Sequence, residues 1–139
     1  MELSAEDYIA IQQLYVRYAL LADMNERDEL VETCWTEDGE YIGFRPGGPR
    51  AKGRDAIKAQ GKKAFVPHEF GYHWNTSPLI EPTEYGASGR CYLLHVIAAE
   101  DGTFSEIRHV LYYRDELVKQ DGRWLFRRRK TTALPEGRA

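Results

Sequence analysis

The residue types that could do acid–base chemistry lie far apart along this chain. Asp23 ends an amphipathic segment near the N-terminus, and His73 lies in the strand-like run 72–76. Histidine titrates near neutral pH and can remove a proton once a carboxylate fixes its tautomer and stabilises the imidazolium. Asp23 would sit at a helix C-terminus, where the dipole disfavours negative charge, so a cationic partner explains it better than helix stability. We therefore predict that folding brings Asp23 and His73 together. The alternatives are a solvated aspartate in a turn and a hydrogen-bonded histidine at a sheet edge.

Tyrosines on the same N-terminal segment could supply hydrogen-bond donors. Tyr15 and Tyr18 are three residues apart and would face roughly the same way on a helix. A phenol in a pocket can polarise a carbonyl or assist a leaving hydroxyl without being ionised. We predict Tyr18 as a catalytic donor and Tyr15 as a substrate contact, with Tyr41 as a second candidate donor. A core role for these tyrosines is equally compatible with the pattern.

Alternation along the expected strands predicts which polar groups share a face. His73 and Asn75 fall on one face of their strand. On a later strand, one face carries Ile107, His109, Leu111 and Tyr113, which suits a pocket wall. We predict Asn75, His109 and Tyr113 as substrate contacts. His95 lies among apolar neighbours, and we interpret it as a core residue.

The final strand carries a basic run, in which Arg127 and Arg129 share a face. One of them could orient a substrate oxygen or stabilise developing negative charge, although such a run is also typical of a solvated edge or a subunit contact. The four histidines show no HxH or HxxxH spacing, so we predict no metal site.

The elements that must position these residues can be placed from periodicity and turn residues. Helices are expected over about 5–23 and 26–34, and a third begins at 53–55 and ends before Pro67. A short strand is expected over 40–44, and antiparallel strands over 69–80, 85–100, 103–120 and 123–133, with Asp-Gly turns at 101–102 and 121–122. Helices followed by a strongly bent sheet predict an α+β fold, a cone with an interior pocket.

Composition narrows the possible classes of protein. The 139 residues, 42% hydrophobic and 29% charged, suit a single domain over 1–139. The net charge of −3 provides no broad basic field for nucleic acid. We find no apolar run of bilayer length and no signal-peptide pattern, so we expect a cytoplasmic protein without a membrane partner. Cys34 and Cys91 lack CxxC spacing and are expected to be reduced core thiols.

The order of elements and several short motifs resemble the SnoaL-like family. The motifs are the turn expected over 36–39, the helix start 53–57, and the C-terminal segments 113–118 and 121–124. This family belongs to the cone-shaped nuclear-transport-factor-2-like superfamily, and the resemblance covers nearly the whole chain. It implies an α+β barrel. The superfamily includes dehydratases, dehydrochlorinases, polyketide cyclases, ketosteroid isomerases, epoxide hydrolases and non-catalytic binding domains, so the fold alone does not settle function.

Within the superfamily, the pattern is most similar to dehydratase and dehydrochlorinase lyases, in which an aspartate holds a histidine base. The resemblance places these roles at Asp23 and His73, the helix donor at Tyr18 and an arginine of the last strand at Arg129. It implies a cofactor-independent lyase that acts by β-elimination. The aromatic content of 12% favours an apolar or aromatic small-molecule substrate, and a close variant of the reaction is carbon–carbon cleavage with loss of formaldehyde from a phenolic substrate. The alternatives are an isomerase or polyketide-cyclase type of proton shuttle and a non-catalytic binding domain. A homo-oligomer is expected.

Overall fold

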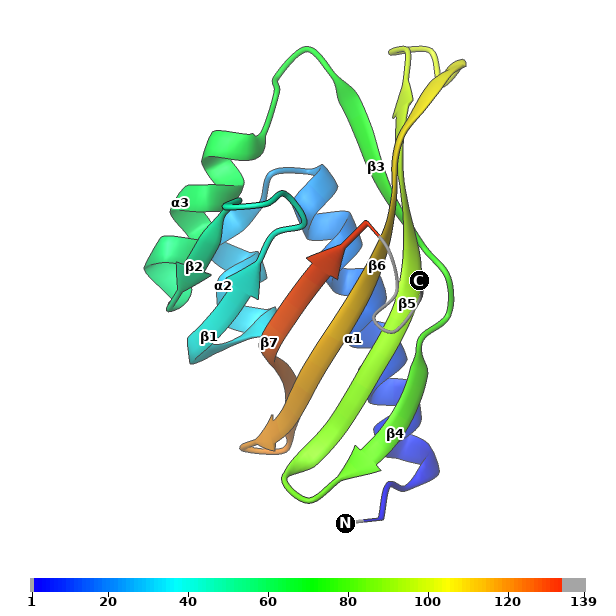
Figure 1. The fold of residues 1–139 in the computed structure, drawn as a ribbon. Helices are drawn as coiled ribbons and strands as arrows, with labels where there is room; N and C mark the ends of the chain where they lie inside the picture. The colour runs from blue at the N-terminus through cyan, green and yellow to red at the C-terminus, as the bar shows by residue number, and fades with distance from the viewer. Residues whose placement is uncertain (1, 134–139) are drawn as a thin grey trace.

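A long N-terminal helix lies against the concave side of a curved sheet in the computed structural model, which describes residues 2–133 (Figure 1). Helix α1 spans Ala5–Asp23 and begins with a capping box, in which the Ser4 hydroxyl accepts from the Asp7 N–H and the Asp7 carboxylate accepts from the Ser4 N–H. Asp7 also accepts a hydrogen bond of 2.8 Å from the Trp124 indole N–H. The first turn of α1 is therefore fixed to Trp124 in the last strand of the sheet.

Two shorter helices complete the helical layer. Helix α2 spans Arg27–Cys34, and α3 spans Arg54–Ala64. Asn25, with φ of 56°, makes the tight turn between α1 and α2. Helix α3 packs on α2 and on strand β1 and buries Ile57 and Gly61. The helices therefore cover one side of the sheet and leave its other side to solvent.

The sheet has seven strands, whose bounds are β1 Trp35–Ile42, β2 Arg50–Lys52, β3 Phe70–Asn75, β4 Leu79–Thr83, β5 Gly86–Ala98, β6 Phe104–Gln120 and β7 Arg123–Thr132. Their order is β2-β1-β7-β6-β5-β3, and β4 also pairs with β5. All pairs are antiparallel except β1 with β7. The α+β cone predicted from sequence is confirmed, as a mixed sheet that curves without closing into a barrel.

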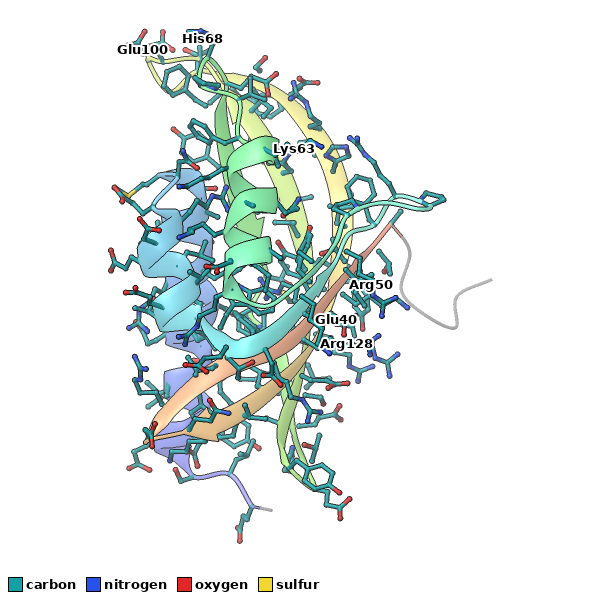
Figure 2. All side chains as sticks on the ribbon, turned by 90° about the vertical axis from the view of Figure 1, so that its left-hand side faces the viewer. Glu40, Arg50, Lys63, His68, Glu100 and Arg128 are labelled. Carbon is teal, nitrogen blue, oxygen red and sulfur yellow. The ribbon has the colours of Figure 1, made fainter. Side chains whose placement is uncertain are left out.

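The curvature is visible edge-on in Figure 2, where the strands arc around the helices. Glu40 and Arg50 form an ion pair of 2.6 Å between β1 and β2. Glu40 lies on the outer side, because its neighbour Tyr41 lines the interior cavity described below. Successive side chains of these strands thus point alternately to solvent and to the interior.

Three details differ from the elements expected from sequence. The single strand expected over 69–80 is two strands, separated by residues 76–78, where Pro78 cannot donate to a ladder. The short strand β2 was not predicted. Strand β1 begins at Trp35 rather than at 40, so the expected turn over 36–39 is wrong; a register shift lies there instead. A side chain at Gly39 would meet the Trp35 ring at 2.7 Å, so this bend packs closely only with glycine.

The core lies between the helices and the concave face of the sheet. Its centre is a cluster of aromatic side chains, made by Tyr15, Tyr18, Trp35 and Phe126, whose ring centroids lie 5.2–6.3 Å apart. Cys34 and Cys91 are buried free thiols, as predicted. None of the helices in residues 2–133 is long and apolar enough to span a membrane.

Candidate active site

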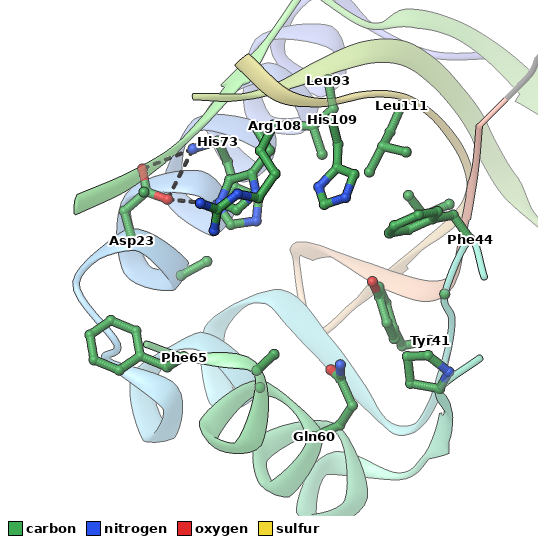
Figure 3. A pocket seen from close by; sticks show the side chains of 18 of the residues that line it. Asp23, Tyr41, Phe44, Gln60, Phe65, His73, Leu93, Arg108, His109 and Leu111 are labelled. Atoms are coloured by element: carbon green, nitrogen blue, oxygen red, sulfur yellow. Dashed lines mark hydrogen bonds and ion pairs between the residues drawn. The ribbon is translucent and has the colours of Figure 1, made fainter. Parts of the chain in front are cut away.

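A cavity of about 430 Å³ lies between the helices and the concave face of the sheet, and Figure 3 shows side chains that line it. All three helices and strands β1, β3, β5, β6 and β7 contribute to its wall. Much of the lining is apolar, from Ala22, Phe44, Phe65, Leu93, Ile97 and Leu111. A cavity of this size and character suits a small, largely apolar molecule, whose orientation would depend on a few polar groups.

Asp23 and His73 meet at one side of this cavity. The Asp23 Oδ1 atom lies 2.6 Å from Nδ1 of His73, and the carboxylate oxygens accept from the His73 backbone N–H at 3.0 and 3.2 Å. A carboxylate at Nδ1 selects the tautomer that carries its proton there, which leaves Nε2 as a proton acceptor. Both residues line the cavity. The contact between them expected from sequence is therefore present in the structure.

Three histidines form a row across adjacent strands. His73 of β3 pairs with His95 of β5, which pairs with His109 of β6. Their ring centroids are 5.3 and 5.9 Å apart, and the last two rings are nearly parallel. His95 lines the cavity, so its interpretation as a core residue is wrong. Residues 2–133 contain no group of three or more His, Cys, Asp or Glu side chains arranged to hold a metal ion.

The local surroundings of these rings disfavour their protonation. Burial, the neighbouring His73 and His109, and Arg108 lower the pKa of His95, against an opposite effect of Asp23. Burial and the cations Arg45 and Arg108 lower the pKa of His109. Both rings are thus favoured in their neutral form, in which each can donate and accept a hydrogen bond.

Three tyrosines also line the cavity. Tyr18 comes from α1, Tyr41 from β1 and Tyr113 from β6. Burial raises the pKa of Tyr18 to about 12, although Arg129 acts in the opposite direction. Burial also raises the pKa of Tyr113 well above the ordinary value. Tyr18 and Tyr113 are thus phenols at neutral pH and can act as hydrogen-bond donors.

Tyr15 and Arg129, expected as substrate contacts, lie behind the cavity wall. The Arg129 side chain is completely buried and donates two hydrogen bonds of 2.8 Å to the Asp115 carboxylate. Tyr15 is also buried, and its hydroxyl donates to the same carboxylate. The guanidinium carbon lies 3.7 Å from the ring centroid of Tyr113 and 4.4 Å from that of Tyr18. Arg129 and Tyr15 therefore support the wall, while Tyr18 and Tyr113 form part of it.

Asn75 faces the same side of β3 as His73 but lies outside the cavity lining. Its Oδ1 atom is buried and has no hydrogen-bond partner among the described residues. The alternation predicted for this strand is correct, because Tyr72 and Trp74 are exposed on the other face. Asn75 is therefore not among the residues that could contact a ligand in this cavity, contrary to the prediction from sequence.

A bulge in β6 brings an unexpected residue into the cavity. His95 pairs with His109 and Val96 pairs with Ile107, so Arg108 is the extra residue between them. Arg108 lines the cavity and bonds to Glu69 at 2.5 Å. The expectation that Ile107 shares the face of His109 is wrong, since Ile107 is 49% exposed. In Figure 3, Arg108, His73 and His109 lie along one wall, with Gln60 of α3 and Tyr41 of β1 on the other side.

Arg27 and Arg45 also line the cavity and were missed by the sequence analysis. Arg27 is the first residue of α2, and Arg45 lies in the loop between β1 and β2. Neither position differs, as a sequence pattern, from an ordinary solvated arginine. Arg27 reaches the cavity because α2 packs against α1 and α3, and Arg45 reaches it because its loop forms part of the cavity wall.

A curved α+β cone with an interior cavity is the architecture of a class of small-molecule-binding domains. Residues 3–130 match the SnoaL-like domain. The chain therefore belongs to the SnoaL-like family. No curated protein matches the chain with significance.

Solved structures place the chain among relatives of known fold. An NTF2-like protein with a cystatin-like fold from Novosphingobium aromaticivorans is 30% identical, with a TM-score of 0.80 over 96% of this chain and 85% of that one. A protein from the same organism, provisionally described as a scytalone dehydratase, is 28% identical, with a TM-score of 0.70 over 94% and 93% of the two chains. ActVI-ORFA from Streptomyces coelicolor is 25% identical, with a TM-score of 0.81 over 90% and 95%.

Proposed function

We propose that this protein is a cofactor-independent lyase in which His73, oriented by Asp23, removes a proton from an apolar or aromatic small molecule. The observation that carries the proposal is the 2.6 Å contact between Asp23 Oδ1 and His73 Nδ1 at the wall of a 430 Å³ cavity. The relative provisionally described as a scytalone dehydratase supports the same reaction type.

The residues fit the proton transfers of a dehydration. Nε2 of His73 takes the proton from carbon, the C–H electrons form the new double bond, and the C–O bond to the leaving hydroxyl breaks. The imidazolium, stabilised by Asp23, returns the proton to the departing hydroxyl, which leaves as water. Tyr18, a phenol at neutral pH, donates a hydrogen bond to the oxygen on which negative charge develops, and Tyr41 is placed for the same role.

A screen of β-hydroxy carbonyl and hydroxylated aromatic compounds, followed by mass spectrometry, tests the reaction type. A product lighter by one water supports dehydration, and release of formaldehyde selects carbon–carbon cleavage of a phenolic substrate instead. An unchanged product mass favours the isomerase or cyclase class. Binding without turnover across the screen would leave a non-catalytic binding domain.

The Asp23 side chain allows a sharper test with two variants. Asp23→Asn keeps an oxygen for the His73 backbone N–H but removes the charge that stabilises the imidazolium, so kcat should fall by roughly 10²–10⁴-fold at nearly unchanged stability. Asp23→Ala should lose the backbone bond as well. Leu79→Ala is a matched control, because that exposed side chain lies outside the cavity lining. Turnover by Asp23→Asn at the wild-type rate would exclude the Asp–His mechanism.

We also propose a homo-oligomer that forms through the outer face of the sheet. Large apolar side chains gather there on neighbouring strands, namely Phe70, Tyr72, Trp74, Tyr92 and Val110, and Trp74 is 68% exposed. A patch of this kind commonly marks an interaction surface.

A further inference from the structure

The charged side chains around the cavity do not balance one another. Its wall carries three arginines, Arg27, Arg45 and Arg108, and two carboxylates, Asp23 and Glu69. Asp23 is bonded to His73, and Glu69 is bonded to Arg108. Among the ion pairs formed by residues 2–133, none involves Arg27 or Arg45. The cavity therefore has an excess of positive charge, in a chain whose net charge is −3.

Arg27 is the inner of these two arginines. Arg27 is half-buried, whereas Arg45 is exposed. Its Nε atom donates to Asn25 Oδ1 at 3.1 Å, and Nη2 donates to the Ala22 carbonyl at 3.4 Å. Neither bond uses Nη1. The guanidinium is thus held in place by its own turn of chain, with donor capacity left over.

Gly61 of α3 makes the space in which the guanidinium lies. A Cβ atom at this position would stand 2.7 Å from Nη1 of Arg27 and 2.9 Å from its Cζ. Gly61 sits inside a helix without a positive φ, so its backbone does not require glycine. The absence of a side chain here serves the position of Arg27. Tyr18, Asp23 and Tyr41 are all close enough to interact electrostatically with the same guanidinium.

We propose that Arg27 binds a negatively charged oxygen of the substrate, a carboxylate or a phenolate on an aromatic body, with Tyr18 and Tyr41 as further donors. The proposal rests on the proposed function only in taking this cavity as the substrate site. Asp23 interacts electrostatically with this half-buried guanidinium but forms no ion pair with it, so an anionic ligand can add the direct charge-assisted bonds that no carboxylate among residues 2–133 supplies. The planar fork of arginine matches two oxygens at once, which a lysine would not do.

Binding of a pair of isosteric probes tests this inference without turnover. Naphthalene-2-carboxylate and naphthalene-2-carboxamide differ in charge but not in shape. By isothermal titration calorimetry, the wild-type protein should bind the carboxylate about 10–100-fold more tightly, the range expected for a hydrogen bond to a charged group. 2-Naphthol distinguishes the phenolate source, because its binding as an anion releases a proton and makes the measured enthalpy depend on the buffer.

Two variants assign the effect to Arg27. Arg27→Met should bind the carboxylate and the amide about equally, and Gly61→Ala should reduce the preference by displacing the guanidinium. Alanine favours a helix over glycine, which offsets the hydrogen bonds lost when the guanidinium moves, so Gly61→Ala should melt close to the wild type. Gly61→Ala therefore still tests the role of Arg27 in anion binding if Arg27→Met fails to fold. Arg45→Met is the matched control at an exposed position, and it should retain most of the preference.

The outcomes separate this inference from the lyase mechanism. Loss of preference in both Arg27→Met and Gly61→Ala supports the anion site, as does Arg27-dependent proton release with 2-naphthol. A wild type that prefers neither anion, or a preference that survives both changes, overturns it. His73→Gln should abolish turnover and keep the preference. Intact anion binding without any turnover in the wild type would reject the lyase and leave the anion site standing.

Discussion

Replacement of Asp115 by asparagine tests whether Arg129 supports the cavity wall or contacts the ligand. The two side chains are completely buried and joined by hydrogen bonds of 2.8 Å from both Nε and Nη2 of Arg129. Asparagine has nearly the same size, so the change removes charge and acceptor capacity without opening a large cavity. It leaves the guanidinium buried without a counterion. The hydroxyl of Tyr15 loses its charged acceptor at the same time.

The expected loss follows from the cost of an uncompensated buried charge. Removal of one partner from a buried ion pair typically costs about 3–5 kcal/mol of unfolding free energy. A domain of this size has a total of about 5–15 kcal/mol, so the variant should lose a large part of its stability. We expect the melting temperature to fall by roughly 10–15 °C, from the usual relation between free energy and melting temperature at this chain length.

Urea unfolding, followed by tryptophan fluorescence and circular dichroism, measures the free energy directly. Glu116→Gln is the matched control on the same strand, because its ion pair with Arg127 is half exposed and should contribute less than about 1 kcal/mol. The double change Asp115→Leu with Arg129→Met should cost less than either disruption of the pair alone. A loss below about 1 kcal/mol in Asp115→Asn would refute this reasoning. So would an Arg129→Met variant that binds ligand poorly at unchanged stability.

Three other predictions concern the cavity and the outer face. Tyr18→Phe should reduce kcat by roughly 10²-fold in the lyase assay, because one donor to the developing charge is lost; an unchanged kcat would remove Tyr18 from the mechanism. His95 has a lowered pKa in the folded protein, so protonation favours unfolding, and stability should fall as the pH drops below the ordinary histidine value of 6.5. His95→Gln should flatten this dependence in melting curves, and an identical slope would contradict it. Trp74→Lys should lower the mass measured by light scattering if the outer face joins subunits, and an unchanged mass would exclude this interface.

The sequence predicted best those elements whose signals lie in neighbouring residues. Helix α1 runs from Ala5 to Asp23 as predicted, because the cap at Ser4 and the periodic apolar residues are properties of neighbouring positions. The alternation that puts His73 on the inner face of β3 is equally local. The meeting of Asp23 and His73, 50 residues apart, was inferred from chemistry and resemblance rather than from any local pattern.

The predictions from sequence failed where the strand register determines which side chains face the interior. At the hairpin between β6 and β7, Gln120 pairs with Arg123, and an unbroken ladder from this pair would put Arg129 opposite Arg114. A shift between Glu116 and Leu117 puts it opposite Asp115 instead, and the two residues form the buried pair. In the same way, the bulge at Arg108 exchanges Ile107 for an arginine on the inner face. A bulge moves side chains by one residue and leaves composition and periodicity almost unchanged, so the sequence did not reveal it.

Asp23 bonds both to the backbone of an edge strand and to a histidine side chain of the cavity. Strand β3 lies at the end of the main strand path, and the His73 N–H bonds to the Asp23 carboxylate rather than to a strand. The carboxylate that accepts from this edge N–H also holds the imidazole of the same residue. Asp23 is thereby bonded to His73, and although it interacts electrostatically with Arg27, four residues further on, it forms no ion pair with it. The contact that fixes the helix end to the strand thus creates the base and leaves the arginine available for a ligand.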